Sequence, residues 1–334
     1  MNILKKIKFK LINFSYYLSN NCFLPFRNLE DDHFNKKIIV YSLVWGSHFE
    51  SYFNYTLPSL LHESNYKKLI NANFSLIFVI YTIDSESFIR EKYKDLIDKN
   101  KHIELEIVEL KNLQSNKPRK IASKAIIDVF KRCVNESSML FLAPPDTIFG
   151  NGSIYNSIFF SFDKKKSFAS AHPRVKYDML ESIRPFSREG ISNSELVYLV
   201  MKHPHDNFKY ADYSLDLNTA DAGISYTKIS DLLYSVISIM PTTYLVFPLK
   251  EDYEYFKKVN DFNMWDRGWL EILIKENRLN ICGSSDLFFC AELTGDSDEE
   301  KQSLLNQKTN ISNQMTIHSR VCSMFTSIWR AKEI

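Results

Sequence analysis

The stretch SSMLFLAPPDTIFGNGS, residues 137–153, joins an apolar run, two prolines, one acid and a glycine-containing loop. Its first part, MLFLA at 139–143, has the length and residue types of a buried strand. Asp146 follows this run directly behind the two prolines, which restrict the backbone. The order predicts a carboxylate fixed at the end of a central strand, where it suits a divalent cation or a sugar hydroxyl. The alternative is an acid that caps a turn with the threonine after it.

Runs of the same kind recur before this stretch and alternate with helical patterns. The predicted strands are 38–44, 74–82, 103–110 and 139–143, and the predicted helices between them are 50–63, 85–98 and 118–134. Each helical segment places its apolar residues on one face. Alternation of this kind predicts right-handed crossovers that feed a mostly parallel sheet. The predicted fold class is therefore α/β with an open, wound sheet.

The rhythm of strand and helix weakens in the second part of the chain. We expect helices at 153–161, 193–202 and 265–277 and strands at 167–171 and 242–249, with an irregular region at 172–230. The chain thus divides into three parts. They are a basic arm and linker at 1–37, an α/β half at 38–171, and a more irregular half at 172–334 that belongs to the same or a closely packed domain.

The composition is that of an ordinary globular protein, with 45% hydrophobic and 25% charged residues. It excludes a disordered chain, a collagen-like repeat and a disulfide-stabilised miniprotein. The formal net charge of +2 is too balanced for a protein held to nucleic acid by bulk electrostatics. Eight glycines and the absence of a G-x-G-x-x-G string argue against a glycine-rich phosphate loop.

The cysteines and the first residues bear on localisation. Five cysteines without a C-x-x-C pair favour a reducing cytosol over a disulfide framework. We find no signal-peptide pattern, and no apolar run approaches the roughly 18 residues of a membrane span. Residues 1–12, MNILKKIKFKLI, place four lysines and no acid among apolar residues. They could lie on an anionic membrane surface, or form a solvated arm or a packed first helix. We expect a cytoplasmic protein, with peripheral contact at the inner face of the membrane through this arm.

Ligands of open α/β sheets bind outside the carboxyl ends of the strands, where loops and helix amino termini converge. After the first predicted strand, Gly46 allows close backbone approach, and Trp45 could meet a ligand ring or cap the core. After the second, Asp84 could hold a ribose or a base, or it could cap the next helix. After the fifth come His172 and Arg174, and the guanidinium of Arg174 offers paired donors for phosphate or carboxylate.

A helix with basic residues near its start leads through a short turn and an apolar strand to the strand-terminal acid. The basic residues are Lys117, Arg119, Lys120 and Lys124, and the acid is Asp146. This order resembles bacterial glycosyltransferases of the GT-A type, which use nucleotide sugars, and the resemblance covers residues 38–171. It implies a GT-A-like sheet that binds a nucleotide-sugar donor. The residues expected near that donor are Trp45, Gly46, Asp84, Lys124 and Asp146.

In that family the strand-end acid belongs to a D-x-D motif, which chelates a metal that bridges the diphosphate of the donor. This chain departs from the motif, because Asp146 has no second acid two residues away. The resemblance therefore leaves the cofactor open. A degenerate motif with Mn²⁺ or Mg²⁺ on Asp146, a metal held through water, and cations in place of the metal are the alternatives.

The segment MWDRGW at 264–269 is the other cluster of interest. By the same resemblance, Asp266 would remove the proton of an acceptor hydroxyl, and Trp265 or Trp269 could stack on the apolar face of a sugar. The alternative is a helix start with Asp266 in its first turn and Trp269 buried. Glu292, like the acid-rich run that follows it, is expected to be solvated charge.

Together these features predict a glycosyltransferase that moves a sugar from a nucleotide-sugar donor to a glycan or lipid-linked acceptor. The resemblance places it in bacterial surface polysaccharide biosynthesis, in capsule or lipopolysaccharide. Asp146 is assigned to the donor or a metal, Asp266 to catalysis, and His172 and Arg174 to the acceptor or a phosphate. The alternatives are a non-catalytic carbohydrate-binding or assembly protein on the same fold, and a nucleotidyl- or phosphotransferase.

Overall fold

A computed structural model describes most of the chain. The described residues are 36–99, 103–110, 118–162, 165–183, 190–205, 209–210, 224–238, 241–259, 267–294 and 325–334. The basic arm predicted at 1–37 lies outside these residues except for its last two positions. Within the described ranges, no helix combines the length and the apolar character needed to cross a membrane.

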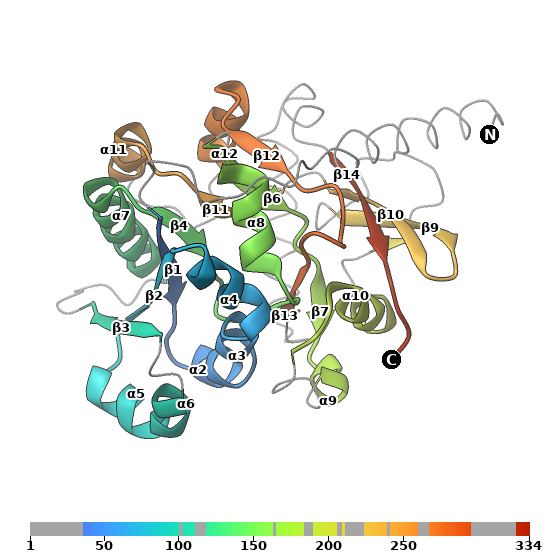
Figure 1. Cartoon of the computed structure of the whole chain (residues 1–334), viewed down its shortest axis with the longest axis horizontal. Coiled ribbons are helices and arrows are strands. Elements are labelled where there is room, and N and C mark those ends of the chain that lie inside the picture. The colour runs from blue at the N-terminus through green and yellow to red at the C-terminus, as the bar shows by residue number, and fades with distance from the viewer. Residues whose placement is uncertain are drawn as a thin grey trace.

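The centre of the described molecule is a seven-stranded sheet in the order β12-β6-β11-β4-β1-β2-β3 (Figure 1). Its strands are β1 (Lys37–Leu43), β2 (Ser75–Thr82), β3 (Glu104–Glu109), β4 (Met139–Leu142), β6 (Ser167–Ser170), β11 (Thr242–Val246) and β12 (Leu279–Ile281). β11 runs antiparallel to β4 and β6, and the other pairings are parallel. The predicted α/β fold with a mostly parallel sheet is confirmed.

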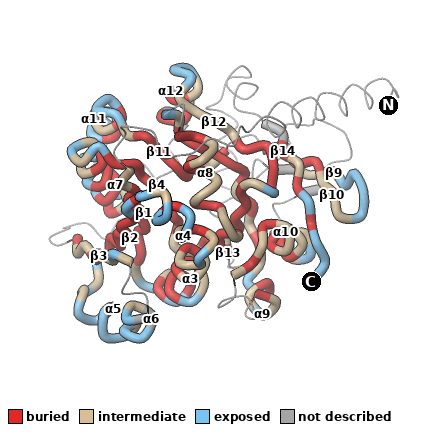
Figure 2. Tube along the Cα trace, in the orientation of Figure 1, coloured by how far each residue is buried: buried red, intermediate tan, exposed pale blue. Residues whose placement is uncertain are grey.

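Helices cover both faces of this sheet, and its inner strands are almost entirely buried, whereas the edge strands β3 and β12 are mostly half-buried (Figures 1 and 2). Successive side chains of a strand point to opposite faces, so Ile38 and Val40 enter one apolar cluster and Ile39 and Tyr41 enter the other. The first cluster is completed by η2 (Tyr52–Thr56), α3 (Leu57–Leu60), α4 (Glu63–Asn71) and α8 (Ser153–Ser161), and the second by α7 (Pro118–Glu136), α11 (Lys250–Val259) and α12 (Arg267–Lys275).

Two of the predicted helices form as broken segments. The segment predicted at 50–63 consists of α2 (His48–Ser51), the π-helical turn η2, and α3, while the one at 85–98 divides into α5 (Glu86–Lys92) and α6 (Lys94–Lys99). π-Helical turns are rare and are frequent at functional sites. The hydroxyl of Thr56 in η2 donates to the carbonyl of Pro145 at 2.9 Å. This turn therefore braces the loop that carries Asp146.

Two smaller sheets extend the fold beyond the central one. One joins β5 (Thr147–Phe149), β13 (Cys290–Thr294) and β7 (Arg174–Lys176), and the other joins β14 (Phe325–Arg330), β10 (Leu233–Ser238), β9 (Ile224–Ser230) and β8 (Lys209–Tyr210). With α9 (Met179–Ile183) and α10 (Asn193–Lys202) they surround a third apolar cluster. Within the described part of 172–230, the helix predicted at 193–202 is confirmed as α10, and the region also holds short strands that were not predicted. β7 pairs with β13, which is distant in the sequence, whereas β9 forms a hairpin with β10, the next strand along the chain.

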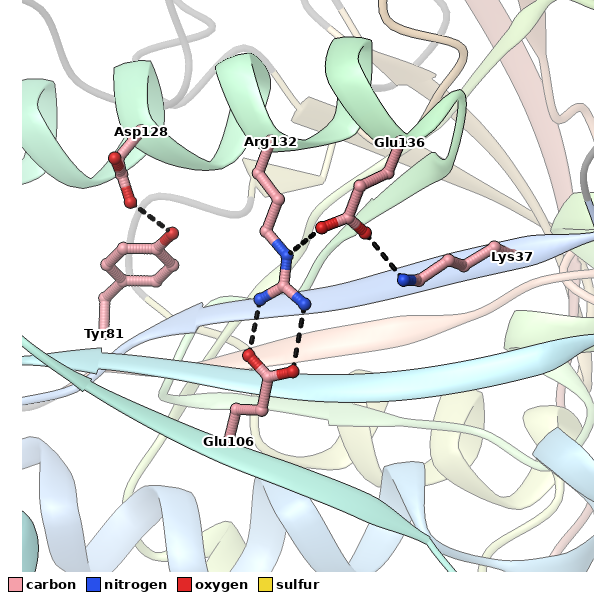
Figure 3. A network of polar contacts seen from close by, with 6 residues as sticks. All are labelled: Lys37, Tyr81, Glu106, Asp128, Arg132 and Glu136. Carbon is pink, nitrogen blue, oxygen red and sulfur yellow. Dashed lines mark hydrogen bonds and ion pairs between the residues drawn. The ribbon is translucent and has the colours of Figure 1, made fainter.

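An ionic network fastens the end of α7 to the central sheet (Figure 3). Arg132 bonds both carboxylate oxygens of Glu106 on the edge strand β3, with Nη2 to Oε1 at 2.9 Å, and its Nε bonds Glu136 at 2.9 Å. Glu136 also pairs with Lys37, the first residue of β1, at 2.7 Å. Two cations are thus matched with two acids, on side chains that are 22–33% exposed.

Candidate functional site

The carboxyl ends of β1, β2, β4 and β6 lie at the same edge of the central sheet, because these strands run parallel. A predicted site residue follows each of them. In the order of the strands across the sheet, these residues are His172 after β6, Asp146 after β4, Trp45 after β1 and Asp84 after β2. Neighbouring strands lie about 4.8 Å apart, so the four steps from β6 to β2 span roughly 19 Å. The structure thus sets the predicted residues in a row along one edge.

The loop after β1 turns sharply at Gly46, whose φ of +56° lies in the left-handed region that favours glycine. Half-buried Trp45 packs against the second apolar cluster, and its ring meets that of His48 edge-on at 6.0 Å between centroids. Burial lowers the pKa of His48, and the charge of Glu292 opposes this effect. Trp45 therefore has a core contact, and it also contacts His48, which senses the charge of Glu292.

Asp84 follows β2 and has a carboxylate oxygen that no described residue satisfies. Its backbone N–H donates to the hydroxyl of Thr82 at 3.0 Å, while its Oδ2 is buried and accepts no hydrogen bond from the described residues. A buried oxygen in this state costs free energy unless a donor reaches it. Hydroxyl or amine groups of a ligand are donors of this kind, and this is the role predicted for Asp84 from its place after the strand.

Asp146 is held in place by hydrogen bonds of the backbone around it. The carbonyl of Pro145 accepts the hydroxyl of Thr56 at 2.9 Å, and the carbonyl of Asp146 accepts the N–H of Leu293 at 2.8 Å. Burial, followed by the negative charge of Glu292, raises the pKa of Asp146 to about 7. The acid predicted at the end of the central strand is therefore a fixed, largely desolvated carboxyl group with a second acid beside it.

Glu292 is that second acid, and it corrects an expectation. Its Oε2 accepts the Nε2–H of His172 at 2.6 Å, and its Oε1 pairs with Nε of Arg174 at 3.0 Å. Burial opposes ionisation of Glu292, but these hydrogen bonds and charges outweigh burial and hold its pKa well below the usual range. Its side chain is 15% exposed, so the expectation of solvated charge is wrong.

The short sheet explains why these residues meet. β13 lies between β5 and β7, and its register sets Glu292 opposite Thr147 on one side and opposite Arg174 on the other. Two cross-strand neighbours therefore bring Arg174 and the residue after Asp146 to the same acid. A sequence signal for this was available in FFCAELT at 288–294, because a nearly continuous apolar run indicates a strand buried on both faces, and an acid buried in such a strand needs a partner.

A series of buried side-chain contacts supports the site from the interior of the protein. Nδ1 of His172 shares a hydrogen bond with the hydroxyl of Tyr244, and that hydroxyl contacts Sγ of Cys290 at 2.7 Å. Burial raises the pKa of Tyr244 well above its ordinary value, so the phenol keeps its proton. With Nδ1 engaged by Tyr244 and Nε2 by Glu292, the imidazole ring of His172 has one orientation that satisfies both contacts. Tyr244 and Cys290 were not among the predicted site residues.

The remaining predicted residues lie away from this cluster or outside the described chain. Trp269 is 2% exposed, packs edge-on against Phe130, and donates its indole N–H to Asp252 at 2.9 Å. This places Trp269 in the core beneath α7, so the structure does not support the predicted stacking on a sugar. Trp265 and Asp266 fall outside the described residues.

Lys124 lies on the exposed side of α7. One turn further along the helix, Asp128 accepts the hydroxyl proton of Tyr81 from β2 at 2.8 Å (Figure 3). Since Tyr81 is the penultimate residue of β2, this contact places the middle of α7 beside the carboxyl end of that strand. Lys124 is therefore on the same side of the molecule as Asp84, and its predicted contact with the nucleotide stays a prediction.

The residues around Asp146 can be tested against the metal that the GT-A resemblance implies. Mg²⁺ and Mn²⁺ prefer several free oxygen ligands. The second acid of this cluster, Glu292, already has His172 on one oxygen and Arg174 on the other. Among the described residues, no group of three or more His, Cys, Asp or Glu side chains could hold a metal ion. The described part of the cluster therefore does not fit a resident divalent cation.

Comparison with known proteins gives low similarity. No family model matches the chain, and no curated protein matches it. Among solved structures it is similar to 4-diphosphocytidyl-2C-methyl-D-erythritol synthase from Anaerococcus prevotii, with 11% identity, a TM-score of 0.40, and coverage of 86% of this chain and 100% of that one. It is also similar to the mannosyltransferase Ktr4p from S. cerevisiae (15% identity, TM-score 0.28, 54% and 53% covered) and to core-mannan synthase A from Aspergillus fumigatus in its Mn/GDP form (10%, 0.34, 77% and 76%). At these TM-scores the similarity carries no functional argument.

Proposed function

We propose that this protein is a glycosyltransferase that moves a sugar from a nucleotide-sugar donor to an acceptor. The observation that carries the proposal is the meeting of Asp146, Glu292, His172 and Arg174 at the carboxyl edge of the parallel sheet. Ligands of open α/β sheets bind at this edge. A rigid set of charged groups there, with an acid whose pKa is strongly raised, is typical of a binding or catalytic site.

The order of the residues along the edge suggests which of them bind the nucleotide and which bind the sugar. Trp45 and Gly46 after β1, and Asp84 after β2, would hold the nucleotide, with Lys124 close to it. Asp146, His172 and Arg174 would meet the sugar, the acceptor or a phosphate. Catalysis would then rest on holding both substrates in register and on stabilising the charge of the departing nucleotide. Asp266 remains our candidate for the base that takes the acceptor proton.

The biological setting is the finer part of the proposal. We propose a glycan or lipid-linked acceptor in bacterial surface polysaccharide biosynthesis, at the inner face of the membrane. The support is the GT-A-type order of residues at 117–146 and the four lysines of the segment 1–12. An arm of this kind would keep the enzyme near a lipid-linked acceptor without crossing the bilayer.

The test is a screen of the purified full chain against UDP-, GDP-, dTDP- and CMP-sugars, with and without Mn²⁺, that records release of the free nucleotide. We expect turnover of one donor, and we expect Asp146→Asn to reduce it by about 100-fold or more. The matched control is Asp231→Asn, because Asp231 is 97% exposed and lies far along the chain in β-turn surroundings between β9 and β10. It should leave turnover unchanged.

Each alternative function gives a different result in the same screen. Release of pyrophosphate would identify a nucleotidyltransferase and overturn the proposal. Failure to bind any nucleotide, combined with binding of free oligosaccharides, would identify a carbohydrate-binding protein. Equal turnover by the wild type and Asp146→Asn would show that the reaction takes place elsewhere.

A further inference from the structure

The charges of the cluster bear on which part of the donor it can hold. Arg174 carries one positive charge and Glu292 one negative charge, and the two are in contact. Asp146 contributes zero or one further negative charge, depending on its protonation. The three side chains therefore sum to zero or minus one. His172 adds a positive charge only when it is protonated. A diphosphate requires a surplus of positive charge, and these three residues do not provide it.

A sugar hydroxyl needs different partners from a diphosphate, because it both donates and accepts a hydrogen bond. Asp146 supplies carboxyl oxygens, and Arg174 supplies guanidinium N–H groups beside them. Glu292 holds Nε of Arg174 at 3.0 Å, so the terminal nitrogens of the guanidinium are not spent on that contact. Arg174 is 33% exposed, which leaves part of it accessible to a ligand, whereas Glu292 is 15% exposed. Acceptors and donors thus flank Glu292, because β13 lies between the strand that follows Asp146 and the strand that carries Arg174.

The position along the sheet agrees with this division. Asp146 and His172 follow β4 and β6, while Trp45 and Asp84 follow β1 and β2. The first group lies toward β6 and the second toward β2 along an edge that spans roughly 19 Å, and the two groups meet at the adjacent strands β4 and β1. A ligand with a nucleoside at one end and a sugar at the other would reach both groups.

We propose that Asp146 and Arg174 bind hydroxyl groups of the donor's sugar, that Glu292 is the positioning residue for Arg174, and that the phosphates of the donor lie outside this cluster. The inference rests on the proposed function and goes beyond it. It assigns the cluster to the neutral sugar end of the donor and gives Glu292 a role through Arg174.

The experiment separates the sugar from the nucleotide. Isothermal titration measures the affinity of the active nucleotide sugar from the screen and of the bare nucleotide that it carries, for the wild type, Asp146→Asn and Arg174→Lys. Arg174→Lys keeps the charge that Glu292 needs but loses the planar fork. We expect both variants to bind the bare nucleotide within about 2-fold of the wild type and to bind the nucleotide sugar about 10- to 100-fold more weakly.

Donors with a deoxy-sugar test for direct contact, because a residue with only a structural role would not change the preference between a sugar and its deoxy form. The wild type should discriminate against a donor that lacks the bound hydroxyl, because its site is left with unpaired polar groups. Asp146→Asn or Arg174→Lys should lose that discrimination for the hydroxyl it contacts and keep it for the others. Glu292→Gln should lose part of the discrimination that Arg174→Lys loses, since it acts through Arg174.

Two outcomes would contradict the inference, and they differ from each other. If both variants weaken the bare nucleotide as much as the nucleotide sugar, the cluster contacts the phosphates, and the inference is wrong while the glycosyltransferase proposal stands. If the wild type binds no nucleotide in the screen, the proposed function is wrong and the inference with it. Thermal denaturation of each variant, with Asp231→Asn as the matched control, verifies that a loss of affinity does not come from unfolding.

Discussion

Two arginine–glutamate networks in this molecule differ in what surrounds them. Arg132 on α7 has Glu106 on its terminal nitrogens and Glu136 on its Nε, and Lys37 completes the pairing of Glu136. Arg174 has one acid on its Nε, and that acid, Glu292, is shared with a histidine. The first network matches every charge that it contains. The second adds a further acid, which no cation of the cluster contacts in the same way.

The difference lies in how the two networks are built. The Arg132 network joins residues of a long helix and two regular strands, and it fastens these elements together. The Arg174 network joins residues at strand ends and on short strands, and a buried tyrosine and cysteine hold it from behind. A network with every charge matched stabilises the fold. A network that buried residues hold rigid, but whose charges are not all paired, is suited to bind a ligand.

The largest expected effect separates the two networks by stability. Arg132→Gln should lower the free energy of unfolding by about 2–3 kcal/mol, because it leaves two acids without their shared cation. This is below the cost for a fully buried pair, since these side chains are 22–33% exposed. Urea denaturation measures the change, and nucleotide-sugar binding should be unaffected.

The control for this substitution is Arg90→Gln. Arg90 pairs with Glu86 one turn away on α5, with side chains 45% and 40% exposed, so its loss should cost at most about 0.5 kcal/mol. If Arg132→Gln costs no more than Arg90→Gln, the network on α7 is a surface feature, and the contrast between the two networks fails.

The next effect is the pH dependence that Asp146 gives to stability. Its pKa is raised from 3.8 to about 7 in the folded chain, so the folded state holds this proton over a range where the unfolded state has lost it. Stability should therefore fall as the pH rises from about 4 to about 7. The full shift would correspond to about 4 kcal/mol. We expect about 2 kcal/mol, because the carboxyl is in part accessible.

Urea denaturation of the wild type and of Asp146→Asn at pH values between 4 and 8 measures this slope, which the variant should lack. Glu292 should change stability with pH in the opposite direction. Its pKa is lowered in the folded chain, so its contribution to stability is lost as the pH falls below about 4.5. Glu292→Gln should remove that acid limb and also reduce the slope above it, because the charge of Glu292 is one cause of the raised pKa of Asp146. Identical curves for the wild type and Asp146→Asn would show that Asp146 is as exposed as an ordinary surface acid.

How much of the fold and of the site could be predicted from the sequence depends on how far apart the interacting residues lie along the chain. Six of the seven strands of the central sheet and the acid after β4 were predicted, because apolar runs and strand ends are local signals, whereas the short edge strand β12 was not. The meeting of Asp146 with Glu292 was not, because it depends on β13 pairing with β5 and β7. Glu292 was placed with solvated charge because an acid-rich run follows it in the sequence. Trp269 shows the converse, since an aromatic residue beside a candidate base proved to be core.

The smallest effect concerns the loop at the nucleotide end of the row. Gly46 has a φ of +56°, and a Cβ added there would meet no atom within 4 Å. Gly46→Ala should therefore cost only backbone strain, about 1 kcal/mol of stability, without a steric clash. Gly46→Asn should cost less, because asparagine tolerates this region better. Thermal denaturation ranks the two variants. A donor that approaches the backbone closely at Gly46 should bind both variants more weakly than the wild type, and the asparagine variant most weakly, because its side chain is larger. Equal affinities for all three would show that the loop after β1 does not contact the donor.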